Sequence, residues 1–193
     1  MRGWMPTGAR AVLPAMVLFG CAVAGTGTER VWRDASGRDQ RPFDVERGRA
    51  AVLVFIAVDC PVSNGYAPEL SRLAGEYAAR GVAFYFVHSD PDATAEVADR
   101  HAKEYGFTAP VLTDPAGTLA RRVGATRTPE AAVVDPDGAV RYLGRIDDRY
   151  ADVHKPRPEP RRRDLREAIE DVLAGRAVRV PRTEVVGCDI PGM

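Results

Sequence analysis

The 193-residue sequence has few cysteines and histidines, three of each, and it carries no net charge. Lysine and arginine number 27, as do aspartate and glutamate, so no basic field points to a nucleic-acid partner. No two histidines stand four residues apart, as a helical metal site would require. We therefore expect His88, His101 and His154 to be scattered packing and surface residues, and we expect neither a metal ion nor a cofactor.

The sequence also lacks an apolar run long enough for a confident membrane span, which needs about 20 residues. Residues 11–25 are apolar and follow Arg2 and Arg10, which is the order of an export signal. Three interpretations of residues 1–28 stay open. Residues 18–21 resemble a bacterial lipobox in which Cys21 is lipidated, residues 22–24 offer an Ala-x-Ala cleavage site, and the segment could instead stay as an uncleaved anchor.

We favour the lipobox, in which Cys21 becomes the mature N-terminus. All three interpretations place the following domain outside the cytoplasm, in the periplasm or cell envelope, where disulfides can persist. The protein would then be secreted or lipid-anchored, and it would touch a membrane only through its leader or a lipid.

The most informative stretch begins at residue 51. Residues 51–58 form an unbroken apolar run rich in β-branched side chains, which is typical of a strand buried on both faces. A helix follows, since apolar side chains recur at helical spacing from Tyr66 to Tyr77. Cys60 lies where the strand gives way to the helix, with Pro61 at the first helical position. Free backbone N–H groups and the helix dipole lower the pKa of a thiol there, although an inert buried cysteine is the alternative.

Strands and helices alternate along the rest of the chain, which indicates an α/β sheet. Residues 90–105 are expected to form a helix that begins at an Asp-Pro cap, and residues 165–173 form an amphipathic helix that packs on the sheet. The remaining elements are expected as strands over residues 31–33, 43–45, 82–87, 111–113, 131–134 and 139–143, and a short helix over residues 117–123.

The strand, the turn Asp59-Cys60-Pro61-Val62-Ser63-Asn64 and the helix with its internal Pro-Glu-Leu resemble the active-site turn of the thioredoxin-like redoxins. This group includes the AhpC/TSA-type peroxiredoxins and the extracytoplasmic thiol–disulfide oxidoreductases. The resemblance covers residues 29–175 and implies a thioredoxin-like fold, with a central mixed β-sheet flanked by helices. Residues 1–28 would be the leader and residues 176–193 a C-terminal tail that contains Cys188.

Two later segments extend the resemblance. Pro129 stands where thioredoxin-like proteins have a cis-proline facing the active-site turn, and Thr128 would offer backbone groups to an extended substrate strand. Residues 128–150, which end in Asp-Asp-Arg-Tyr, and the Thr-x-x-x-Gly-Cys pattern of residues 183–188 resemble one redoxin subgroup. The acidic pair Asp147 and Asp148 is expected to form a structural ion pair or a helix cap.

Several positions depart from the family patterns. Ser63 replaces the second cysteine of a C-x-x-C turn, so a mixed disulfide cannot be resolved within the turn. Leu53 and Ala57 replace the proline and the hydroxyl residue that precede a peroxiredoxin cysteine, and Asn64 replaces the second cysteine of copper-delivery relatives. Three arginines could supply a guanidinium to the site, but the spacing selects none of them: Arg121, Arg122 and Arg127.

These observations favour an exported redoxin that exchanges thiols and disulfides, with Cys60 as nucleophile. Loss or lipidation of Cys21 leaves Cys188 as the one candidate resolving cysteine. Protein thiols or disulfides would be its substrates, with a thioredoxin-type reductant as candidate electron donor. Two alternatives stay open: an antioxidant thiol peroxidase, and a non-catalytic binding module with a permanent Cys60–Cys188 disulfide.

Overall fold

The structure is a computed structural model that describes residue 1, residues 30–46 and residues 49–193. The predictions on the export signal, including lipidation of Cys21, lie outside the described residues. None of the helices in the described part combines the length and apolar composition needed to cross a bilayer.

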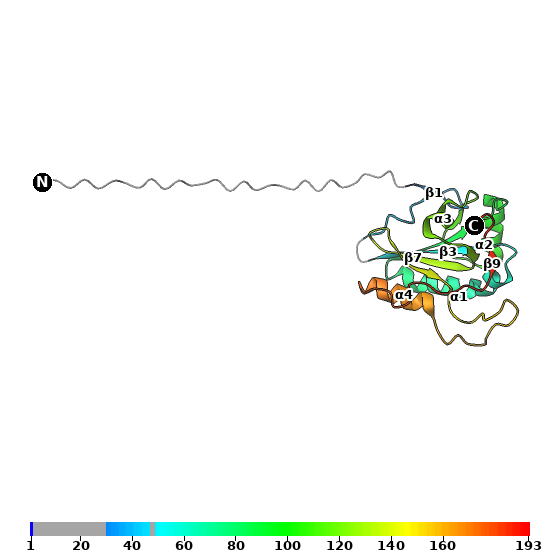
Figure 1. Ribbon diagram of the computed structural model, residues 1–193. Helices are drawn as coiled ribbons and strands as arrows, with labels where there is room; N and C mark the ends of the chain where they lie inside the picture. Colours follow the sequence, from blue (N-terminus) through cyan, green and yellow to red (C-terminus); the bar gives the residue numbers. More distant parts are fainter. Residues whose placement is uncertain (2–29, 47–48) are drawn as a thin grey trace.

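A five-stranded mixed sheet forms the centre of the molecule, in the order β5-β4-β3-β7-β8 (Figure 1). The first three strands of that order run parallel, β7 lies antiparallel to β3, and β8 lies antiparallel to β7. The bounds are β3 Ala50–Ile56, β4 Val82–His88, β5 Val111–Thr113, β7 Glu130–Val134 and β8 Val140–Gly144. The mixed sheet predicted from the sequence is therefore confirmed.

The central strand β3 is buried on both faces, as its apolar run predicts. Because alternate side chains of a strand point to opposite faces, Val52 and Val54 join one apolar cluster while Leu53 and Phe55 join the other. The first cluster packs under helices α1 (Pro61–Ala78) and α4 (Asp164–Leu173), which lie on the same side of the sheet in Figure 1. Helix α3 (Thr118–Val123) covers the other face.

The helix predicted for residues 90–105 is shorter than expected. Helix α2 spans Ala95–Tyr105 and begins at Thr94, whose side chain accepts from Val97 N. The predicted cap at Asp90 is wrong, because its carboxylate accepts from Asp92 N and closes a local turn instead. Gly106 ends the helix with a φ of 69°, the left-handed conformation that suits glycine.

The N-terminal part of the domain is a small hairpin of β1 (Trp32–Arg33) and β2 (Asp39–Gln40). The strand predicted for residues 43–45 is not formed, since residues 41–46 contain no strand. Phe43 lies in a turn and packs against Trp32, with ring centroids 6.2 Å apart. Packing against the core therefore takes the place of strand pairing for this residue.

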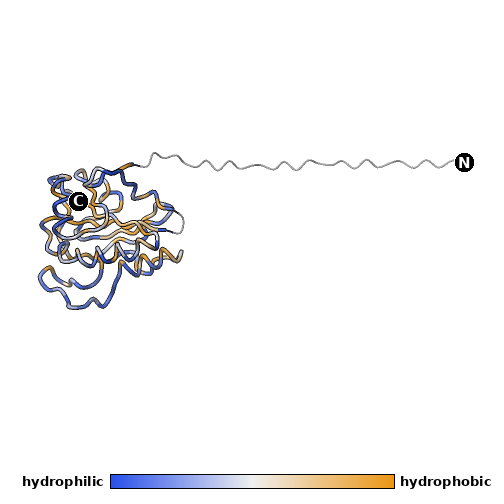
Figure 2. The backbone as a smooth tube through the Cα atoms, turned by 180° about the vertical axis from the view of Figure 1, so that it is seen from behind, coloured by the Kyte–Doolittle hydropathy of each residue, from blue (hydrophilic) through white to orange (hydrophobic). Residues whose placement is uncertain are grey.

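The C-terminal tail leaves α4, runs along β8 and returns to the end of the sheet that carries α1 (Figure 1). There β9 (Cys188–Asp189) pairs with β6 (Arg127–Thr128) in a separate two-stranded sheet. Figure 2 shows apolar residues gathered in the central strands, while the long loop after β8 is hydrophilic. The tail is thus part of the folded domain and ends beside the Cys60 turn.

Candidate active site

Cys60 occupies the junction that the sequence predicts. It is the N-cap of α1, with Pro61 in the first helical turn, and only 1% of its surface is exposed. Its Sγ donates to Thr128 O at 3.2 Å, and its own carbonyl accepts from Asn64 N at 3.0 Å. The buried strand and the helix start together place the thiol at the sheet's end, against the loop that contains Thr128.

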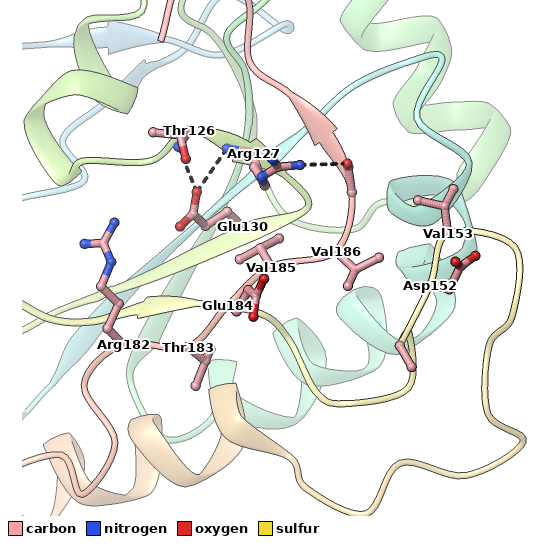
Figure 3. Close-up of a pocket in the computed structure, with 12 residues that line it drawn as sticks. Thr126, Arg127, Glu130, Asp152, Val153, Arg182, Thr183, Glu184, Val185 and Val186 are labelled. Atoms are coloured by element: carbon pink, nitrogen blue, oxygen red, sulfur yellow. Dashed lines mark hydrogen bonds between the residues drawn. The ribbon is translucent and has the colours of Figure 1, made fainter.

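The peptide bond between Thr128 and Pro129 is cis, which confirms the expectation from the resemblance. The loop around it is held by Glu130, whose buried carboxylate accepts from Thr126 N at 2.8 Å and from Arg127 N at 3.0 Å (Figure 3). Sequence reasoning did not single out Glu130. Its position three residues after Arg127 would have been the signal, because a carboxylate can accept from nearby backbone N–H groups.

Cys188 is brought to the same place by strand pairing. It lies directly opposite Thr128 in the β6–β9 register, and Thr128 O is the acceptor of the Cys60 thiol. Both cysteines are free thiols; Cys60 is buried and Cys188 is half-buried. The tail can therefore return to Cys60, as the cysteine count suggested, and the pairing of the two thiols in a disulfide stays a prediction.

The two thiols differ in acidity. Burial raises the pKa of Cys60, but hydrogen bonds with Cys188, Ser63 and Thr128 outweigh burial and lower that pKa below its ordinary value. Burial, together with the hydrogen bond to Cys60 and the charge of Cys60, raises the pKa of Cys188 to about 11. Cys60 is therefore the more acidic thiol of the pair, and Cys188 is the one that keeps its proton more readily.

Two buried hydroxyls lie beside the Cys60 sulfur. Ser63 and Thr128 are 0% and 3% exposed, and neither side-chain oxygen has a hydrogen-bond partner among the described residues. A buried hydroxyl without a partner is costly, so these groups need an acceptor. The thiolate form of Cys60 supplies one, which agrees with the lowering of its pKa by both residues.

Of the three candidate arginines, Arg127 is the one at the site. Its guanidinium lies 3.3 Å from an Asp189 carboxylate oxygen and donates to Gly187 O at 3.3 Å. Its charge also lowers the pKa of Cys188, although less than burial raises it. Arg122 stacks over the Phe43 ring and Arg121 donates to a backbone carbonyl in the loop before α3.

Asn64 connects the turn to two buried histidines. Its Nδ2 donates to Val58 O at 2.8 Å, so its Oδ1 is the acceptor for His101 Nε2 at 2.9 Å. His101 Nδ1 must then accept from His88 Nε2 at 3.2 Å, which leaves the buried His88 Nδ1 without a partner among the described residues. The expectation of scattered histidines is wrong for this pair, because α2 packs beside the end of β4 and brings them together.

Burial disfavours the charged form of both His88 and His101. Burial, and to a lesser extent the neighbouring His101, lowers the pKa of His88 to about 4. Burial also lowers the pKa of His101, against the opposing effect of Glu104 and Asp59. His154 lies exposed in a loop, as the sequence analysis expects. Among the described residues, no three His, Cys, Asp or Glu side chains are close enough to hold a metal ion.

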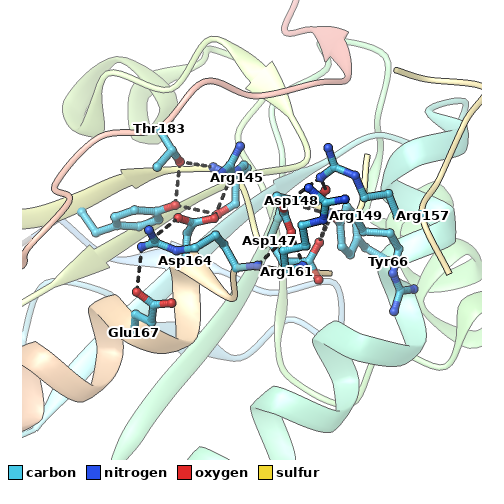
Figure 4. Close-up of polar contacts among 12 residues, drawn as sticks. Tyr66, Arg145, Asp147, Asp148, Arg149, Arg157, Arg161, Asp164, Glu167 and Thr183 are labelled. Atoms are coloured by element: carbon cyan, nitrogen blue, oxygen red, sulfur yellow. Dashed lines mark hydrogen bonds and ion pairs between the residues drawn. The ribbon is translucent and has the colours of Figure 1, made fainter. Parts of the chain in front are cut away.

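The acidic pair after β8 is structural. Asp147 is buried and accepts from Tyr66 OH of helix α1 and, at 2.8 Å, from Arg149 N (Figure 4). Asp148 forms an ion pair with Arg157 at 2.7 Å. Burial raises the pKa of Asp147 despite these bonds. The pair ties the loop after β8 to the helix that begins at Cys60, which agrees with the structural role expected from the sequence.

The arrangement defines the class of protein. A mixed sheet flanked by helices, a cysteine at the start of the first long helix and a facing cis-proline make up a thioredoxin-like fold. The AhpC/TSA family matches residues 28–143, more than half of the chain. The protein therefore belongs to the AhpC/TSA family. No curated protein matches the chain.

Solved structures with the same fold cover most of the chain. An uncharacterised conserved protein from Geobacillus kaustophilus is 28% identical, with a TM-score of 0.72 over 84% of this chain and 89% of its own. A hypothetical protein from Sinorhizobium meliloti is 29% identical, with a TM-score of 0.70 over 83% and 89%. DsbF of Mycobacterium tuberculosis, solved in mixed oxidised and reduced forms, is 26% identical, with a TM-score of 0.50 over 58% and 81%.

Proposed function

We propose that the protein is an exported thiol–disulfide oxidoreductase with Cys60 as nucleophile and Cys188 as resolving cysteine. One observation carries the proposal: strand pairing places Cys188 directly opposite Thr128, whose carbonyl oxygen accepts from the Cys60 thiol at 3.2 Å. The lowered pKa of Cys60 and the raised pKa of Cys188 support the same assignment of roles. A low pKa supplies the thiolate that attacks disulfides, and a neighbouring thiol supplies the second electron pair needed to complete exchange. The similarity to DsbF, which occurs in oxidised and reduced forms, supports the same chemistry.

The reaction follows from the two acidities. The Cys60 thiolate attacks one sulfur of a substrate disulfide; the substrate S–S bond breaks, and the departing thiolate takes a proton. Cys188 then loses its proton and attacks the Cys60 sulfur of the mixed disulfide, which releases the second substrate thiol. The protein dithiol is oxidised to a Cys60–Cys188 disulfide while the substrate disulfide is reduced to two thiols. An external dithiol of the thioredoxin type would return the protein to its reduced form.

The proposed setting is extracytoplasmic. The charged, apolar and small-residue order of residues 1–28 supports export, with Cys21 as the favoured lipidation site. In this proposal residues 29–175 form the redoxin domain, and residues 176–193 form a tail that carries the resolving thiol. An oxidising compartment would let the Cys60–Cys188 bridge persist between reaction cycles.

Trapping of the mixed disulfide tests the proposal. We expect Cys60→Ser to abolish reduction of a model disulfide, because serine carries no thiol that could attack a disulfide. Cys188→Ser should still form the mixed disulfide but should fail to release the second thiol, so that the adduct accumulates on Cys60. Non-reducing peptide mapping by mass spectrometry identifies the modified residue. An adduct on any other cysteine, or full turnover by Cys60→Ser, would overturn the assignment of Cys60.

The Ser63 hydroxyl should tune the nucleophile without being essential. Because Ser63 lowers the pKa of Cys60, we expect Ser63→Ala to raise that pKa and to slow exchange at pH 7 by roughly two- to tenfold. Ser71→Ala is the matched control, since the Ser71 hydroxyl lies on the same helix but donates to Gly106 O. The rate of iodoacetamide alkylation against pH gives the pKa directly, and identical profiles for the two variants would contradict this role.

Peroxide reduction is the competing activity within the same family. Leu53 and Ala57 stand where peroxiredoxins carry a proline and a hydroxyl residue, and the Ala57 methyl group cannot donate to a peroxide oxygen. We therefore expect little peroxide consumption by the reduced protein under conditions in which a disulfide is reduced efficiently.

The second alternative is a permanent structural disulfide between Cys60 and Cys188. Treatment with a mild reductant tests it, because a catalytic bridge should open and a structural one should resist.

A further inference from the structure

The backbone edge beside Cys60 is occupied by the chain's own tail. Residues 127 and 128 pair with residues 189 and 188 in antiparallel register, and Ile190 N donates to Thr126 O at 2.9 Å. The Arg127 guanidinium secures the same segment through Gly187 O and Asp189, each at 3.3 Å. An exposed strand edge accepts any extended chain that offers matching groups, so this edge is a pairing site already in use.

This pairing closes access to the nucleophile. The Cys60 thiol donates a hydrogen bond to Thr128 O, and Thr128 lies directly opposite Cys188 in the strand pairing. Only 1% of the Cys60 surface is exposed. A disulfide carried on another polypeptide cannot reach the Cys60 sulfur while residues 188–190 hold the edge of β6. The backbone groups that would align such a polypeptide are the same ones that the tail now uses.

The tail is tied at two points and loosely held between them. The inner anchor lies on β8, where Leu143 N donates to Pro181 O at 2.9 Å and the Thr183 hydroxyl bonds to Tyr142 OH at 2.8 Å (Figure 4). The outer anchor is the pairing with β6, together with the buried Ile190 side chain. Between the anchors, residues 184–186 make no hydrogen bond within the described part of the chain.

Residues 184–186, which lie between the two anchors, border a groove of about 470 Å³, so there is open space beside this part of the tail (Figure 3). If the outer anchor detached, the inner anchor at residues 181–183 would still tie the tail to β8 and keep Cys188 within reach of Cys60.

Gly187 makes the outer anchor possible. A Cβ atom at this position would lie 1.9 Å from Thr128 O, a distance that real Cβ atoms do not reach, and 2.8 Å from Thr128 C. Backbone atoms cannot swing aside as a flexible side chain can, so any larger residue must push the tail off the edge. The close approach of Cys188 to Thr128 thus depends on the glycine that precedes it.

We propose that residues 187–190 are an internal strand that an extended, disulfide-bearing polypeptide segment must displace before it reaches Cys60. Such a segment would pair with residues 126–128 in place of the tail and present its disulfide to the Cys60 thiolate. Return of the tail then brings Cys188 to the mixed disulfide and expels the substrate strand. This inference rests on the proposed thiol exchange and adds the step that controls access to Cys60.

Alkylation of Cys60 by a bulky reagent tests the access step. In the full chain with Cys188→Ser as background, Gly187→Ala should raise the plateau rate with a polyethylene-glycol maleimide about tenfold or more. Gly75→Ala is the matched control, since a Cβ there meets nothing within 4 Å. The plateau at high pH removes any effect of a changed thiol pKa, and mass spectrometry of the Cys60 peptide excludes reaction at Cys21. Equal rates for the two variants would overturn the proposal.

A second variant protects this test against misfolding. Ile190→Ala weakens the outer anchor by removing a buried side chain and leaves the Thr128 backbone untouched. It should raise the rate in the same direction, with an unchanged circular dichroism spectrum. If Gly187→Ala unfolds the domain and Ile190→Ala leaves the rate unchanged, the tail does not control access and the proposal is wrong.

The substrate class is tested with two disulfides on the same variants. The first is an extended peptide of the tail's own sequence, residues 184–191, with its cysteine joined to thionitrobenzoate, and the second is oxidised glutathione. We expect Gly187→Ala to accelerate exchange with the peptide about tenfold more than with glutathione. Equal acceleration would overturn the polypeptide class. If neither disulfide reacts with Cys60 in any variant, the proposed exchange itself fails, while the alkylation rates still report on the tail.

Discussion

Oxidation of Cys60 and Cys188 to a disulfide is expected to raise the free energy of unfolding by about 4 to 5 kcal/mol. The bridge would close a loop of roughly 130 residues, and the chain-entropy treatment assigns about 5 kcal/mol to the constraint on an unfolded chain of that length. The native state is already arranged for it, because strand pairing places Cys188 opposite Thr128 and beside the Cys60 sulfur. Little rearrangement of the folded chain is therefore needed to form the bond.

Urea unfolding of the oxidised and the reduced protein measures this difference. Non-reducing peptide mapping first establishes that the oxidised sample carries the Cys60–Cys188 pair. Cys188→Ser is the control, and its unfolding free energy should not depend on the redox state. If the mapping finds both thiols free under oxidising conditions, Cys60 acts as a monothiol that needs an external partner. If the bridged and the reduced protein unfold at the same urea concentration, the bridge does not stabilise the folded state.

The sequence was sufficient to predict the parts of the site that depend on local pattern. The apolar run before Cys60 and the helical spacing after it place the thiol at a strand–helix junction, and the structure has it there. The cis bond at Pro129 followed from the resemblance and is confirmed. These features are set by neighbouring residues or by a motif, so one sequence carries the information.

Features that depend on distant contacts were harder to predict. His88 and His101 show no spacing that signals a pair, because one ends a strand and the other lies on a helix, and only the packing of β4 beside α2 joins them. The start of α2 was placed too early because Asp90 has the residue type of a cap but bonds within its own turn. The sequence identifies Cys188 in the tail as the candidate partner of Cys60, but it does not predict the strand register that brings Cys188 there. That register depends on the pairing with β6 and on the close approach that Gly187 allows.

The buried pair of His88 and His101 predicts that the folded protein loses stability in mild acid. Burial lowers the pKa of His88 to about 4, whereas an unfolded chain has a histidine pKa of about 6.5. Between these values the unfolded state binds more protons than the folded state, so stability falls as the pH is lowered through this window. The contribution of His88 is fully present above about pH 6.5, and its loss between pH 7 and pH 5 is roughly 2 kcal/mol. His101, whose pKa is also lowered by burial, acts in the same direction.

Urea unfolding of the unmodified protein and of two histidine variants at pH 7 and pH 5 separates the titration of His88 from that of other groups. We expect the loss of stability on acidification to shrink in His88→Gln, because glutamine carries no proton that differs between the two states. His154→Gln is the control, since His154 lies exposed in the loop after β8 and should leave the loss unchanged. The comparison uses the difference between the two pH values within each variant, so the cost of replacing a buried side chain cancels. An equal loss in all three proteins would show that the buried pair titrates as it does in the unfolded chain, and that burial does not lower the pKa of His88.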